Sequence, residues 1–220
     1  MTRTHRHLML AAGVAAISAA AMAVAPAGQA LDRLSFVTAW LCLLFFAGTL
    51  LIGPLQVRRT GRLPGNHLLR RDLGIWCVIT GMVHFFLAFK VSMNLEYMAI
   101  YVRGAEAWPA PAVRELMYRW AVLASLVIAV LFMLLLALSN NLAIRLLGKR
   151  WWKRLQRVSY AAFALTVGHS IAFQVLEART GWLVAAFAII IAAVVIAQSA
   201  GRVRLRGSGH AGPRQEDSVA

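Results

Sequence analysis

The sequence is poor in acidic residues and in cysteine. Asp and Glu together number 8 of 220 residues, and charged residues of both signs make up 14%, against about 25% in soluble domains. Both cysteines, Cys42 and Cys77, lie inside apolar runs, which excludes a disulfide framework and a Cys-x-x-Cys site. The segments between the apolar runs are too short to form a flavin or nicotinamide domain.

Most of the chain consists of long apolar runs. Hydrophobic residues make up 60% of the chain, and its formal charge is +15. The positive charge is gathered in short clusters between apolar runs, which argues against nucleic acid as a partner and is typical of a membrane protein with basic loops. Since a helix needs about 20 apolar residues to cross a bilayer, we expect an all-α membrane protein, a six-helix transmembrane bundle with spans at residues 8–25, 34–52, 73–95, 118–138, 155–176 and 182–200.

The first run has a second interpretation. A basic start, an Ala-rich stretch and small residues around Pro26 also fit a cleaved signal peptide, and cleavage would leave five spans. The run is longer than a usual signal core, which favours a retained helix. We therefore expect residues 1–200 to form the bundle and residues 201–220 a disordered cytoplasmic tail.

The basic residues predict the orientation of the chain. Most of the 23 Lys and Arg residues fall in the segments on one side of the predicted spans. Positive loops stay in the cytoplasm, so the pattern predicts a multi-pass membrane protein with both termini cytoplasmic. The same clusters are suited to contact with anionic membrane lipid.

Two histidines lie deep in the predicted spans. His84 comes 12 residues after Asp72, and His169 comes 12 residues after Arg157. At 1.5 Å per residue both lie roughly 18 Å above the inner boundary, just past the midplane. The two helices run in the same direction, so their imidazoles share one level in the bilayer.

Two imidazoles at the same level inside a membrane bundle can serve only a few functions. Two nitrogens without a nearby Cys or carboxylate make a poor zinc site, and a proton relay would need acids inside the membrane. Haem fits better, with His84 and His169 as axial ligands of the iron, although two structural histidines bonded to carbonyls are the alternative. Small residues at Gly81 and Gly168 would leave space beside the rings, and we expect aromatic packing from Phe85, Phe86, Phe89, Tyr160, Phe163 and Phe173.

Two stretches resemble a known family. LLRRDLGIWCVITGMVHFFLAF, which contains His84, and LGKRWWKRLQRVSYAAFALTVGHSIAF, which contains His169, are similar to the third- and fifth-helix regions of ferric-reductase-like transmembrane domains. Within that family they resemble the haem-binding membrane subunits of bacterial protein-methionine-sulfoxide reductase systems. The resemblance implies electron transfer across the membrane through haem b ligated by the two histidines.

The resemblance also bears on haem number and on partners. This chain has Gln156 where the family commonly has a further His, so we expect one haem rather than two. The electrons would come from a separate cytoplasmic flavin reductase or from quinol, and would pass to an extracytoplasmic oxidoreductase. The chain would then be an electron-transfer subunit rather than a complete enzyme. A stand-alone ferric or metal reductase component and a non-redox transporter or assembly factor are the alternative functions.

Overall fold

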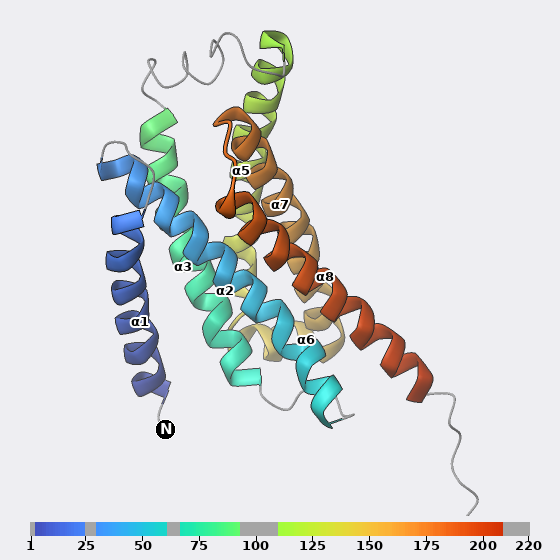
Figure 1. Ribbon diagram of the computed structural model, residues 1–220. Helices are drawn as coiled ribbons and strands as arrows, with labels where there is room; N and C mark the ends of the chain where they lie inside the picture. Colours follow the sequence, from blue (N-terminus) through green and yellow to red (C-terminus); the bar gives the residue numbers. More distant parts are fainter. Residues whose placement is uncertain (1–2, 25–29, 61–66, 93–109, 209–220) are drawn as a thin grey trace, which may run out of the picture.

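The computed structural model describes residues 3–24, 30–60, 67–92 and 110–208 (Figure 1). These residues are helical almost throughout and contain no strand. Helices are the expected form because every backbone polar group in lipid must find its partner within the segment. The helices are α1 (Arg3–Val24), α2 (Ala30–Thr60), α3 (His67–Ser92), α5 (Pro111–Ala137), α6 (Asn141–Gln156), α7 (Val158–Leu176) and α8 (Trp182–Ser208).

Within the residues that the structure describes, six helical stretches are long and apolar enough to cross a membrane, which confirms the predicted all-α, six-span architecture. The fifth comprises α6 and α7 together, from Asn141 to Leu176. The last helix differs from the prediction in length, because α8 continues past residue 200 to Ser208. The remainder of the predicted tail, residues 209–220, lies outside the described residues.

A separate helix, α6, forms the first part of this fifth stretch, where the sequence analysis expected only a basic connection before a span at residues 155–176. The Asn140 side chain caps it by accepting a hydrogen bond of 2.7 Å from the backbone N–H of Ala143. Gly148 kinks it, with φ 72° and ψ 157°, a conformation that glycine adopts without steric cost. Arg157 joins α6 to α7 with right-handed helical dihedrals.

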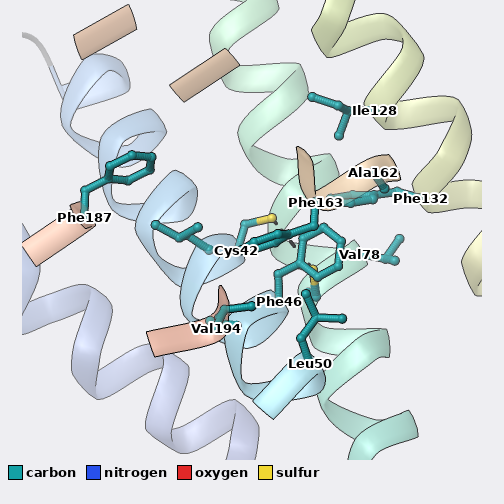
Figure 2. Packing of buried hydrophobic residues seen from close by; sticks show 13 residues of the cluster. Cys42, Phe46, Leu50, Val78, Ile128, Phe132, Ala162, Phe163, Phe187 and Val194 are labelled. Carbon is teal, nitrogen blue, oxygen red and sulfur yellow. Dashed lines mark hydrogen bonds between the residues drawn. The ribbon is translucent and has the colours of Figure 1, made fainter. Parts of the chain in front are cut away.

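Helix α2 is central to the packing. It packs against α1, α3 and α8, while α5 packs against α3 and α7. One buried cluster joins α2, α3, α5, α7 and α8. In it, Phe46 of α2 meets both Phe132 of α5 and Phe163 of α7 edge to face, with ring centroids 5.5 Å and 5.3 Å apart (Figure 2). Such edge-to-face pairs add to the stabilisation that burial gives.

The helices place the chain's basic segments at one end of the bundle. The N-terminal ends of α1 and α3, the C-terminal ends of α2 and α8, and helix α6 all lie at the lower end in Figure 1. We call this the α6 end. The ends where α3 finishes and α5 begins lie opposite, and we call this the far end.

Candidate functional site

The two membrane histidines meet between helix pairs. His84 is on α3, which packs against α2, and His169 is on α7, which packs against α5. Their ring centroids are 6.4 Å apart and their planes are inclined at 79°. Both side chains are partly buried. The structure therefore brings together the two residues that depth along the sequence had placed at one level.

Each imidazole is oriented by a backbone carbonyl on a neighbouring helix. Nδ1 of His84 lies 2.9 Å from the carbonyl oxygen of Ser35 on α2, and Nδ1 of His169 lies 2.9 Å from the carbonyl oxygen of Ala121 on α5. A carbonyl only accepts, so each Nδ1 carries the proton and donates it, which is a tautomer assigned from the hydrogen-bond partner. Each Nε2 then presents a lone pair.

This arrangement is the one that metal-binding histidines use. Ligating imidazoles donate their second ring N–H to a carbonyl or carboxylate, which fixes ring orientation and raises the basicity of the ligating nitrogen. The separation fits as well. With metal–nitrogen bonds of about 2 Å, and each ring centre about 1 Å behind its nitrogen, two imidazoles on one ion have ring centres about 6 Å apart.

The number of protein ligands at the site distinguishes between possible metals. In the described part of the chain, no group of three or more His, Cys, Asp or Glu side chains could hold a metal ion. A zinc site needs three or four protein ligands, whereas haem iron takes four nitrogens from the porphyrin and needs only axial donors from the protein. Two imidazoles therefore suit the axial positions of a haem iron better than they suit a zinc ion.

One of the expected aromatic residues lies at the pair. The ring of Phe173 is 4.9 Å from that of His169. In contrast, Phe86 and Phe89 are 62% and 48% exposed on the outside of α3. They follow His84 by two and five residues, and at 100° per residue these positions point away from its face.

The other two rings on α7 also serve different contacts. Phe163 belongs to the buried cluster, and the hydroxyl of Tyr160 lies 3.4 Å from Oε1 of Gln198. The aromatic shell expected around the histidines is therefore mostly directed elsewhere.

The two glycines beside the histidines do not leave open space, contrary to the sequence prediction. A Cβ at Gly168 would lie 2.8 Å from the Trp120 ring, and one at Gly81 would lie 3.0 Å from Sγ of Cys42 and would overlap the Phe132 ring. Both rings come from α5. The glycines thus let α5 approach α3 and α7 closely.

Cationic side chains gather where α2, α5 and α7 reach the far end. The guanidinium of Arg179 lies 4.5 Å above the Phe36 ring and pairs with Glu177. Arg114 is buried and donates to the carbonyl oxygen of Leu176 at 2.7 Å. Arginine is the residue best suited to pair with carboxylates, and a porphyrin carries two of them.

The carbonyls of Ser35 and Ala121 were missed by sequence reasoning. A backbone carbonyl has no sequence signature, because any residue at those two positions supplies the same acceptor. Only the packing of α2 against α3, and of α5 against α7, identifies them.

Fold and site together define a polytopic helical membrane protein with a facing pair of imidazoles inside the bundle. No protein-family model matches the chain, and no solved structure matches it.

Proposed function

We propose that this protein carries electrons across the membrane through one haem b held by His84 and His169. The observation that carries the proposal is the paired geometry: two rings 6.4 Å apart, each with Nδ1 on a backbone carbonyl and Nε2 left for a metal. Two structural histidines would need only the carbonyl bonds and an edge-to-face ring contact, so the spectrum of the purified protein decides between the two interpretations.

The chain's own residues hold and orient the site. The carbonyls of Ser35 and Ala121 fix both rings and make each Nε2 a better donor to a metal. The surrounding helices keep the pair in apolar surroundings that limit access of water. When bound, haem b supplies reversible one-electron chemistry, with its potential set by the axial ligands and by burial.

The pair lies nearer the far end of the bundle. Eight residues, or about 12 Å, separate His84 from the end of α3 at Ser92, whereas 17 residues, or about 26 Å, separate it from His67 at the α6 end. Gln156, in the position where the resembled family commonly has a further His, ends α6 and is not a usual haem ligand. These positions support one haem, placed close to an acceptor on the extracytoplasmic side.

The partners follow from this placement and from the resemblance. The donor in this proposal is a cytoplasmic flavin reductase or a membrane quinol, and the acceptor is an extracytoplasmic oxidoreductase that reduces protein methionine sulfoxide. The membrane is the bacterial inner membrane, with the α6 end in the cytoplasm because basic segments stay on that side.

The test is the absorbance spectrum of the purified full-length protein from haem-replete cells, before and after dithionite. We expect the bands of a six-coordinate haem b at one haem per chain. His84→Ala and His169→Ala each remove the six-coordinate spectrum, and folding is checked by thermal unfolding.

Two variants serve as controls. His5→Ala removes a histidine outside the site. Ser35→Ala removes the longer contact of Oγ with Nδ1 of His84, at 3.3 Å, but keeps the backbone carbonyl that orients the ring at 2.9 Å, so both variants retain the wild-type bands. Folded wild-type protein without haem, or a wild-type spectrum in both site variants, would overturn the proposal. Reduction of the haem by quinol in vesicles, compared with reduction by a flavin reductase, identifies the donor.

A further inference from the structure

Helix α6 is the polar part of the fifth candidate span. Helices α6 and α7 together make up that stretch of 36 residues, whereas about 20 residues are enough to cross a bilayer. The 19 residues of α7 contain no Asp, Glu, Lys or Arg, so α7 can supply the span and leave α6 at its end. Figure 1 shows α6 across the lower end of α5 and α7. None of its residues is buried. The Trp152 indole fixes it there by donating to the Leu138 carbonyl oxygen at 2.8 Å.

The exposed surface of α6 is both apolar and cationic. Leu142, Leu146 and Trp151 are 61%, 76% and 59% exposed. No Asp or Glu occurs between Asn141 and Gln156, so the helix contains no acid to neutralise its five cations. All five are exposed: Arg145, Lys149, Arg150, Lys153 and Arg154.

The cations form two rows after the kink at Gly148. Lys149 and Lys153 are four residues apart, as are Arg150 and Arg154, so each pair shares a face of the helix. The guanidinium of Arg154 lies 5.0 Å from the Trp151 ring centroid. Tryptophan is enriched at the headgroup level of bilayers, and its contact with Arg154 places apolar and charged surface at the same depth.

We propose that α6 is a membrane-surface helix that binds the phosphate groups of anionic phospholipids. Only a lipid interface offers both parts of what this surface requires, because acyl chains cover the leucines and Trp151 while phosphates meet the lysines and arginines. An acidic soluble partner would satisfy the charges but would have to cover three large apolar side chains as well. The proposal is independent of haem binding.

The test measures which lipid surrounds α6. Leu146→Cys is labelled with a fluorophore in the full-length protein; the native Cys42 and Cys77 are buried, and labelled wild-type protein gives the background. The protein is placed in nanodiscs of equal parts phosphatidylglycerol and phosphatidylcholine. Two otherwise identical samples differ only in which of the two lipids carries a nitroxide quencher on its acyl chain.

We expect the phosphatidylglycerol quencher to be enriched about two- to fivefold over the phosphatidylcholine quencher. The combined substitutions Lys149→Ser, Arg150→Ser, Lys153→Ser and Arg154→Ser should bring the ratio close to one. The matched control, Arg58→Ser with Arg59→Ser at the exposed end of α2, should keep it. In the unmodified helix, 1 M salt should lower the ratio, because it shortens the screening length to about 3 Å.

Two results would overturn the proposal. Equal quenching by both lipids would show a helix that lies on the membrane without selecting anionic headgroups. Absence of quenching by either lipid would show that Leu146 faces water, and this surface would then be free for a protein partner.

Discussion

The rings of His84 and His169 stand nearly at right angles, with an interplanar angle of 79°. The angle follows from the helices that orient them, since the acceptor for His84 is on α2 and the acceptor for His169 is on α5. Neither ring can turn without losing its hydrogen bond. The structure thus fixes the mutual orientation of the two donors as well as their separation.

This orientation predicts a spectroscopic signature. If two imidazoles at this angle held a haem, each ring would overlap a different one of the two iron d orbitals of π symmetry. Those two orbitals would then be close in energy, and the oxidised protein should show a low-spin electron paramagnetic resonance spectrum with one prominent low-field feature. Haem with free imidazole in the same detergent is the reference. A well-resolved rhombic spectrum, typical of parallel ligand planes, would contradict the perpendicular arrangement.

Depth along a helix was the part of the site that the sequence could predict. The rise per residue is constant, so equal distances of His84 and His169 from charged helix starts place them at one level before any packing is known. Span number was predictable for a related reason, because bilayer thickness sets the length of each apolar run.

Packing direction was not predictable in the same way. The sequence shows that Gly81 and Gly168 are small but not which side chain fills the space beside them, and the structure places Phe132 and Trp120 there. Helix α6 was not predicted because its cluster of basic residues was interpreted as a loop between two spans. Its capping residue Asn140 and the kink at Gly148 become clear only from backbone geometry.

The close approach at Gly81 predicts a selective loss of stability. In Gly81→Ala the new methyl group meets the Phe132 ring and Sγ of Cys42, and since Phe132 is 2% exposed, the ring has little room to move. Overpacking of this kind costs about 1–3 kcal/mol. Thermal unfolding in detergent should therefore show a lower Tm.

A glycine on the same helix provides the control. A Cβ at Gly74 would lie 3.9 Å from Cγ2 of Thr49, an ordinary contact, so Gly74→Ala should leave the Tm unchanged or raise it slightly. Equal effects of the two substitutions would show that helix propensity, rather than the contact with α5, decides the outcome.

Another prediction concerns the attachment of α8 to α2. Nε2 of Gln198 donates to the Leu50 carbonyl oxygen at 2.7 Å, and its Oε1 lies 3.4 Å from the Tyr160 hydroxyl. Gln198→Leu removes the stronger bond and should cost about 1 kcal/mol, the usual size of a hydrogen bond between membrane helices. Tyr160→Phe removes the long, exposed contact to Gln198 but keeps the bond to Leu50, and should cost much less. If Tyr160→Phe lowers the Tm as far as Gln198→Leu does, the hydrogen bond from Gln198 to the Leu50 carbonyl oxygen does not contribute more to stability than the contact with Tyr160.

The last prediction concerns Asp72, which is fully buried at the α6 end of α3. Oδ2 of Asp72 accepts from Nε of Arg6 at 3.0 Å, and Nε2 of His7 lies 3.5 Å from its Oδ1. The Trp76 indole donates to Nδ1 of His7 at 3.2 Å, which leaves the His7 proton on Nε2, facing the carboxylate. The first helix, whose apolar window is not buried, is thus held to α3 by polar contacts.

Removing the Arg6 guanidinium takes away the positive charge that stabilises the buried carboxylate of Asp72. Arg6→Met should lower the free energy of unfolding by about 1–3 kcal/mol, measured in detergent, while Arg58→Met on the exposed end of α2 should change it little. Because Arg6 and Asp72 act as a pair, Arg6→Met combined with Asp72→Leu should cost less than the sum of the single changes. Strictly additive effects would show that α1 is attached to the bundle in another way, since contacting charges on neighbouring helices must couple if they stabilise each other.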